Sequence, residues 1–266
     1  MAGAEFRWRG AMKALAIPAD ILEAAPESPF GFPAAIWGRP LEPIDSPSRR
    51  RALEALPQAG SVLDVGAGGG AASLALTPRA AHIIAVDESE DLLEAFAANA
   101  RSAGVGHSTI LGRWPDVAPQ APAAHVVVCH HVFYNALDLA EFARALTAHC
   151  RGRVVAELTA THPLDGFNDL WRHFHGIDRP RGPNADDVIA VLAESGIGVR
   201  SERWERPSMW TDAPRSAVVG FVRRRLCLAP EHDPEIDALI GDSAERTPRQ
   251  VITLWWGSEA PSPRTT

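Results

Sequence analysis

The feature that most constrains this chain is a short apolar run that leads directly into a cluster of glycines. Residues 61–65 are largely apolar, residues 66–70 read Gly-Ala-Gly-Gly-Gly, and residues 71–76 have a helical composition. Glycine allows the backbone to turn tightly and to approach a ligand closely, and the first turn of a helix offers unpaired N–H groups. A strand, a glycine-rich turn and a helix in this order predict a ligand site in an α/β protein.

An acidic residue lies where nucleotide-binding α/β folds place one. Asp87 ends a second apolar run at residues 81–86, and it follows Gly66 by roughly 20 positions, as a ribose-binding carboxylate does. A glycine-rich turn alone also occurs in α/β proteins that bind no nucleotide. The strand, the helix and Asp87 together predict a nucleoside cofactor, and Gly66-x-Gly68-x-x-Ala71 also fits the dinucleotide fingerprint.

The wider pattern predicts a parallel sheet that is covered on both faces. Apolar runs alternate with helical segments, and runs that are apolar on both faces are typical of strands buried between two helical layers. Ser46 and Pro47 have the residue types that start a helix, which we expect to end near residue 56. We expect strands over residues 61–65, 81–86, 108–111, 124–129, 153–158, 198–206 and 250–256, and helices over residues 71–76, 92–103, 136–149, 185–194, 217–228 and 234–240.

The glycine segment and its preceding acid read Asp64-x-Gly66-x-Gly68-x-Gly70, and here the sequence resembles the class I S-adenosylmethionine-dependent methyltransferases. The order of elements is also similar, since residues 250–256 stand where that family has its antiparallel seventh strand. The resemblance covers about residues 46–256 and is strongest over residues 61–158. It implies an α/β fold, namely a three-layer Rossmann-like methyltransferase fold with a mostly parallel seven-stranded sheet and helical cap insertions.

In this family the glycine-rich loop holds the methionine end of S-adenosyl-L-methionine, and the acid after the second strand holds its ribose. The chain departs from the pattern twice: Arg113 stands where the family often has an aspartate near the adenine, and His125 opens the fourth strand in place of an aspartate. Trp114 either offers an aromatic face to the adenine or packs in the core. The resemblance implies cofactor contacts at Asp64, Gly66, Ala67, Gly68, Gly70, Asp87, Glu88, Arg113, Trp114 and His130.

Candidate catalytic residues follow the fourth and fifth strands, because ligands of open α/β sheets bind at the carboxyl ends of the strands. A general base assists methyl transfer when the acceptor is a hydroxyl or a cationic amine. Histidine titrates near neutrality, so His131 and His162 are the candidate bases. No metal is expected, since His173 and His175 lie two apart in a helical segment and their side chains would diverge.

Charge and composition narrow the choice of partners. A net charge of −7 argues against nucleic acid and anionic membranes, and the basic triplets at residues 49–51 and 223–225 are more typical of solvated helix faces. No apolar run approaches the roughly 18 residues of a membrane span. The three cysteines have no framework spacing. We therefore expect a cytoplasmic protein, monomeric or homodimeric, that binds a small-molecule methyl acceptor.

The domain organisation and the function follow from these expectations. We expect an N-terminal helical or lid segment at residues 1–45, an S-adenosylmethionine-binding methyltransferase domain at residues 46–256 with a cap insertion at about residues 159–183, and a disordered tail at residues 257–266. The expected reaction is O- or N-methylation of a small molecule. Two alternatives stay open: an NAD(P)-dependent oxidoreductase, which explains the glycines and Asp87 equally well, and a non-catalytic S-adenosylmethionine-binding protein.

Overall fold

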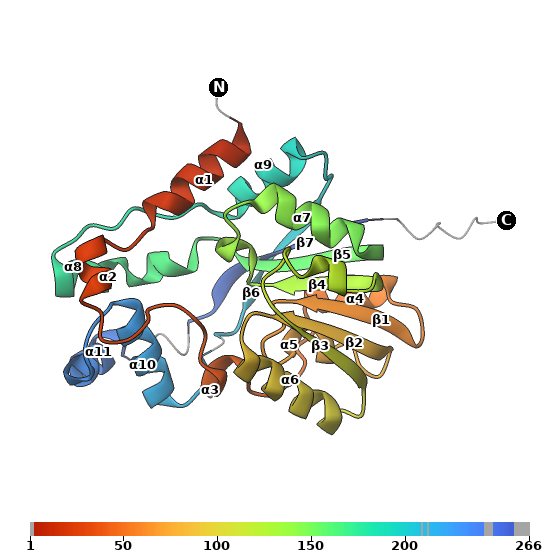
Figure 1. The fold of residues 1–266 in the computed structure, drawn as a ribbon, viewed down its shortest axis with the longest axis horizontal. Coiled ribbons are helices and arrows are strands. Elements are labelled where there is room, and N and C mark those ends of the chain that lie inside the picture. Colours follow the sequence, from red (N-terminus) through yellow and green to blue (C-terminus); the bar gives the residue numbers. More distant parts are fainter. Residues whose placement is uncertain (1–2, 209, 212, 242–246, 258–266) are drawn as a thin grey trace.

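The seven expected strands form one sheet in the order β3-β2-β1-β4-β5-β7-β6 (Figure 1). The structure is a computed structural model that describes residues 3–208, 210–211, 213–241 and 247–257. Every strand lies within a few residues of the place that the sequence pattern predicts. The strands are β1 (Gly60–Val65), β2 (Ala80–Asp87), β3 (Gly106–Leu111), β4 (Ala124–His130), β5 (Cys150–Thr159), β6 (Arg200–Arg206) and β7 (Arg249–Gly257).

The last strand runs against its neighbours. β7 pairs antiparallel with both β5 and β6, whereas β1 to β5 pair with one another in parallel. The prediction of an antiparallel strand at residues 250–256 is thus confirmed. A dinucleotide-binding sheet consists of parallel strands in the order 3-2-1-4-5-6 and has no such strand.

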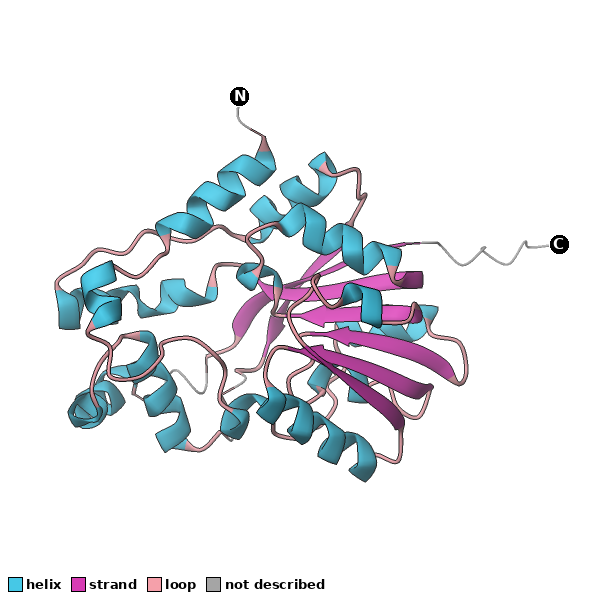
Figure 2. Cartoon of the chain, viewed as in Figure 1, coloured by secondary structure: helices cyan, strands magenta, loops and turns pink. Residues whose placement is uncertain are grey.

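Alternate side chains of the strands enter two separate cores, as the two-residue period of a strand requires. Val62 and Val128 pack among residues of α4, α5 and α6, and Leu63 and Val127 pack among residues of α1, α7 and α9. The sheet is therefore the middle of three layers (Figure 2). The layer helices are α1 (Ala4–Ala14), α4 (Pro47–Ala55), α5 (Ala71–Leu74), α6 (Glu90–Ser102), α7 (Leu139–Ala148) and α9 (Ala185–Glu194).

Polar caps explain where several of these helices begin. The Ser46 hydroxyl accepts a hydrogen bond from the Arg49 N–H at 3.1 Å, which confirms the predicted start of α4. Asn184 and Asp187 form a reciprocal capping box at the start of α9. These caps satisfy N–H groups that the helix cannot bond internally, so the boundaries follow from local sequence.

A third apolar cluster forms a cap beyond the carboxyl ends of the parallel strands (Figure 1). The cap contains the predicted insertion at residues 159–183 and part of the N-terminal segment. It also contains described residues between β6 and β7, among them the helices at residues 215–225 and 233–240, whose place in the fold the sequence pattern left open. An antiparallel pair needs only a short loop, so a long connection there indicates an added layer. The cap helices are α2 (Ala19–Glu23), α3 (Ala34–Trp37), α8 (Asn168–His175), α10 (Arg215–Arg225) and α11 (Asp233–Ile240).

The N-terminal segment serves two different parts of the fold. Trp8 of α1 is 1% exposed and donates its indole N–H to the Ala136 carbonyl at 2.9 Å, so α1 belongs to the layer of α7 and α9. Ile17, Ile36 and Trp37 pack instead with the cap. Of the expected tail at residues 257–266, residues 258–266 lie outside the described part of the chain. No helix in the described ranges is long and apolar enough to cross a membrane.

Candidate functional site

A cavity of about 1370 Å³ lies between the cap and the carboxyl ends of the strands. Most of the predicted site residues line it, although they come from four separate loops. Asp64, Gly70 and His162 do not line it. The predicted residues in its wall are Gly66, Ala67, Gly68, Asp87, Glu88, Arg113, Trp114, His130 and His131.

The glycine-rich loop and Asp87 form one hydrogen-bonded unit. Gly66 and Gly68 have φ values of 72° and 53°, the left-handed region that favours glycine. The Asp87 carboxylate accepts hydrogen bonds from the Gly68 N–H at 2.9 Å and from the Ser89 N–H at 3.0 Å. Burial raises the pKa of Asp87, and these two backbone donors oppose the rise. Asp87 therefore shapes the loop as well as facing the cavity.

Asp64 lies beneath the loop rather than in the cavity. Its carboxylate is 1% exposed and accepts a hydrogen bond from the Ser73 hydroxyl at 2.5 Å. Burial raises the pKa of Asp64 to about 7, against the lowering effect of the Ser73 hydrogen bond. Gly70 is the N-cap of α5, and a Cβ there would lie 2.7 Å from the Phe96 ring. Both residues thus support the loop from behind.

The two departures from the family pattern lie in different places. Arg113 lines the cavity, and its guanidinium donates to the Asn135 carbonyl at 3.5 Å. Its neighbour Trp114 is 5% exposed, lines the cavity and packs in the core, with its indole N–H 3.4 Å from the Phe142 carbonyl. His125 lies at the start of β4, far along the strand from the cavity, where its Nδ1 accepts from the Ser61 N–H at 3.0 Å. His125 therefore plays no part in this site.

Part of the N-terminal segment docks on the glycine-rich loop. Residues 30–44, here called the N-terminal arm, line the cavity through most of their length. The Gly69 N–H donates to the Trp37 carbonyl at 2.7 Å. The Asn99 side-chain amide of α6 donates to the carbonyls of both Gly38 and Gly69, at 3.0 and 2.9 Å. The arm is thus a wall of the site, bonded directly to the loop.

The close packing of arm and loop predicts the effect of a single methyl group. A Cβ at Gly69 would lie 2.6 Å from the carbonyl carbon and oxygen of Gly38. We expect Gly69→Ala to displace the arm and to lower the free energy of unfolding by about 2 kcal/mol, the usual cost of overpacking. Urea unfolding measures this, with Gly10→Ala as the control, because a Cβ at Gly10 meets nothing within 4 Å. Equal stability of Gly69→Ala and the wild type would show that the arm does not rest on the loop.

A buried polar cluster adjoins the cavity at the ends of β4, β5 and β6. The Glu157 carboxylate is 1% exposed. It accepts hydrogen bonds from the Ser48 hydroxyl at 2.5 Å, from the Arg206 guanidinium, and from His131 Nε2 at 3.1 Å. Glu157, Ser48, Arg206 and His131 all line the cavity. Sequence reasoning missed three of these four residues; an acid inside the otherwise apolar run of β5 was the available signal.

The charges around Glu157 keep it ionised. Burial alone would raise the pKa of Glu157, but the hydrogen bond from His131 and the electrostatic interactions with His130, His131 and Arg206 outweigh burial and hold the pKa well below its usual range. A carboxylate at this point can fix the proton of a histidine on one ring nitrogen. The arrangement places an oriented imidazole, that of His131, at the cavity wall.

Three cavity residues carry buried polar atoms that have no hydrogen-bond or ion-pair partner in the described part of the chain. They are His130 Nε2, one guanidinium nitrogen of Arg39 in the N-terminal arm, and Nε of Arg225 on α10. Burial lowers the pKa of His130 to about 4, so its ring is neutral at pH 7. Unpaired buried polar atoms are costly in a folded protein. Their position in a cavity wall is what a site for a polar ligand requires.

The second candidate base lies outside the cavity. His162 is 4% exposed, its Nδ1 accepts from the Leu164 N–H at 3.2 Å, and its ring meets the Tyr134 ring edge-on at 4.9 Å. Burial lowers the pKa of His162 to about 4. Tyr134 donates to the Thr159 carbonyl at 2.8 Å. We therefore assign His162 to packing beneath the cap and not to the site.

His173 and His175, the two histidines of α8, contact different partners. His173 lies 2.8 Å from a Glu235 oxygen, whereas His175 lies 2.7 Å from the Leu226 carbonyl. Within the described ranges, no group of three or more His, Cys, Asp or Glu side chains is placed to hold a metal ion.

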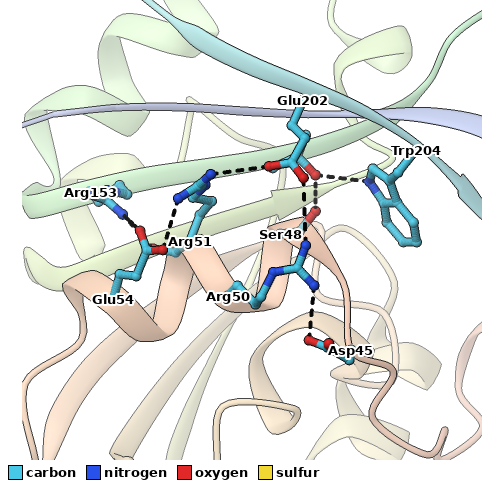
Figure 3. Close-up of polar contacts among 9 residues, drawn as sticks. Asp45, Ser48, Arg50, Arg51, Glu54, Arg153, Glu202 and Trp204 are labelled. Carbon is cyan, nitrogen blue, oxygen red and sulfur yellow. Dashed lines mark hydrogen bonds and ion pairs between the residues drawn. The ribbon is translucent and has the colours of Figure 1, made fainter.

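The first basic triplet, residues 49–51, is engaged within the protein. Arg50 pairs with Asp45 at 3.2 Å and Glu202 at 3.6 Å, and Arg51 pairs with Glu54 at 2.9 Å and Glu202 at 3.2 Å (Figure 3). Arg153 also pairs with Glu54 (Figure 3). These ion pairs join α4 to β5 and β6. The second triplet, residues 223–225, lies on α10 and faces the cavity.

Comparisons with known proteins agree with this fold. Residues 62–152 match a family model described as a methyltransferase domain. No curated protein sequence matches the chain significantly. Residues 62–152 are therefore similar to a methyltransferase domain, and the order of the strands agrees with the fold that the sequence resemblance implies.

Solved structures support the fold over most of the chain. A protein of Bacillus halodurans C-125 that is named as a methyltransferase is 16% identical, with a TM-score of 0.51, over 80% of this chain and 99% of that one. The YcgJ protein of Bacillus subtilis is 15% identical, with a TM-score of 0.51 and the same coverage. A Galdieria sulphuraria protein named as a sarcosine dimethylglycine methyltransferase is 13% identical, with a TM-score of 0.52, over 79% and 82%. At these identities the likeness concerns the fold.

Proposed function

We propose that this chain is an S-adenosylmethionine-dependent methyltransferase that acts on a small-molecule acceptor. The observation that carries the proposal is the glycine-rich loop bonded to Asp87 in the wall of a cavity that His130 and His131 also line. A cavity roofed by a cap suits a small molecule better than a polymer. The antiparallel β7 favours this function over an NAD(P)-dependent oxidoreductase, because the dinucleotide fold lacks such a strand.

The residues of the cavity fit S-adenosyl-L-methionine. When bound, it supplies an electrophilic methyl group on a sulfonium centre. The loop glycines leave room for its methionine end, Asp87 would hold its ribose hydroxyls, and Trp114 would lie against its adenine. The unpaired guanidinium nitrogen of Arg39 would hold its carboxylate, since the arm that carries Arg39 is bonded to the loop.

The chain's own part in methyl transfer is orientation and proton removal. Glu157 would hold the proton of His131 on Nε2, which leaves Nδ1 able to accept a proton from a hydroxyl or an amine of the acceptor. Arg206 and Ser48 hold Glu157 in place. The cap and the arm would exclude water while the acceptor lies in line with the methyl group.

Loss of His131 tests the catalytic part of the proposal. We expect His131→Ala to lower kcat by about 100-fold, as loss of a general base does, with little change in cofactor affinity. The assay is formation of S-adenosylhomocysteine with a panel of hydroxyl and amine acceptors. His82→Ala is the matched control, since His82 is exposed and does not line the cavity. Full activity of His131→Ala would remove the base from the mechanism, and cofactor binding without turnover of any acceptor would favour a binding protein.

A further inference from the structure

The cap presents one helix face to the cavity, and that face is basic. Ala217, Phe221 and Arg224 of α10 line the cavity at spacings of about one turn, so they share one side of the helix. The side chain of Arg224 forms no hydrogen bond or ion pair with any residue in the described part of the chain. A long cationic side chain thus reaches the cavity with its donors available.

The neighbouring arginines show that positive charge at this wall is not balanced. The charge of Arg223 is met by Glu27 at 2.8 Å and by Asp233 at 2.9 Å. Arg225 has no acidic partner in the described ranges; it donates to the carbonyls of Pro29 at 2.8 Å and Gly31 at 3.1 Å.

The guanidinium of Arg225 also lies over aromatic rings, 4.9 Å from the centroid of Phe221 and 5.0 Å from that of Phe32. Burial, and then the charge of Arg224, lower the pKa of Arg225 to about 10, and the group still remains a cation at pH 7. Two adjacent guanidinium groups without a counter-anion make this wall attractive to a negative group.

The same end of the cavity carries aromatic side chains of the N-terminal arm. Phe30 is 58% exposed and lines the cavity between Pro29 and Gly31, whose carbonyls accept from Arg225. Phe32 also lines the cavity, and its ring centroid lies 6.4 Å from that of Phe221. Large apolar groups gathered at one site commonly mark a binding surface. Single-ligand sites measure roughly 300–1,000 Å³, so a cavity of about 1370 Å³ has room for a second molecule beside the cofactor.

From these observations we infer that the acceptor is an apolar carboxylic acid, with its carboxylate at Arg224 and its apolar body against Phe30 and Phe32. This inference rests on the proposed function, because it treats the α10 end of the cavity as the acceptor subsite. The cofactor end is separate, since Asp87 and the glycine-rich loop lie on the sheet and not on the cap. The acid group recognised here need not be the methylated atom.

The test compares an acid with its matched alcohol. Protein saturated with S-adenosylhomocysteine is titrated calorimetrically with 6-phenylhexanoate and with 6-phenylhexan-1-ol. We expect the acid to bind about tenfold more tightly, as a charge-assisted contact provides. The preference should disappear in Arg224→Gln and persist in Arg224→Lys. Arg144→Gln, on the exposed side of α7, should behave as the wild type.

The outcomes separate this inference from the proposed function. Equal affinity for acid and alcohol in the wild type, or no binding of either, would overturn the inference. An Arg224→Gln protein that still prefers the acid would also overturn the inference. Loss of affinity for S-adenosylhomocysteine in Arg224→Gln would overturn it too, because Arg224 would then bind the cofactor. Failure of S-adenosylhomocysteine to bind the wild type contradicts the proposed function alone. In that case the titrations with 6-phenylhexanoate and 6-phenylhexan-1-ol are repeated on the protein without S-adenosylhomocysteine, and they test the preference for the acid independently.

Discussion

Asp87→Ala should weaken the binding of S-adenosylhomocysteine by about 100-fold or more. The side chain has two tasks that alanine cannot perform. It accepts the Gly68 and Ser89 N–H groups, which fixes the loop, and it would accept the ribose hydroxyls. Hydrogen bonds to a charged group contribute about 1.5–3 kcal/mol each, so the loss of two or more reaches this magnitude. Calorimetric titration measures the change.

The matched control for Asp87 is the nearby acid Glu90, in the first turn of α6. Glu90→Gln removes a carboxylate from an exposed position that does not line the cavity, and we expect it to bind as the wild type does. Thermal unfolding of Asp87→Ala distinguishes a lost contact from a collapsed loop. Unchanged affinity in a folded Asp87→Ala protein would remove Asp87 from the ribose site.

Glu157→Gln should lower the free energy of unfolding at pH 7 by about 3 kcal/mol, the usual cost of removing one partner of a buried ion pair. The change leaves the Arg206 guanidinium without its counter-charge and replaces the carboxylate that accepts from His131 with a neutral amide. Urea unfolding measures the loss. Glu54→Gln is the control, because Glu54 pairs with Arg51 and Arg153 near the surface, where ion pairs contribute about 1 kcal/mol or less.

The pH dependence gives Glu157 a second, independent readout. Its pKa lies well below the ordinary value of 4.5, so its stabilising effect is complete above that value and is lost as the pH falls toward the folded pKa. The wild type should therefore lose stability as the pH falls below 4.5, and Glu157→Gln should lose less. Parallel losses in the two proteins would contradict a buried, ionised Glu157.

The sheet could be predicted from sequence because its determinants are local. Apolar runs such as 61–65 and 124–129 need helices on both faces, and Ser46 and Gly66 mark where elements begin and end. The positions of Asp87 and His131 in the cavity wall could be predicted because the carboxyl ends of parallel strands meet at the same edge of the sheet. His162 also follows a parallel strand, β5, yet it packs against Tyr134 beneath the cap and does not line the cavity.

The rest of the site depends on contacts between segments that are distant in the sequence. Ser48, Glu157 and Arg206 come from α4, β5 and β6, and no spacing in the sequence relates them. The arm was expected as a lid, but its bonds from Gly69 and Asn99 involve backbone carbonyls, which any residue provides. The cap helix that carries Arg224 belongs to the connection between β6 and β7. Only the length of that connection indicated an additional layer.

The central claim is that the loop and Asp87 bind S-adenosylmethionine rather than a nicotinamide nucleotide. The direct measurement is calorimetric titration of the purified protein with S-adenosylhomocysteine and, in parallel, with NADH and NADPH. We expect S-adenosylhomocysteine to bind at micromolar concentration and neither nicotinamide nucleotide to bind. Binding of NADH or NADPH without binding of S-adenosylhomocysteine would contradict the claim.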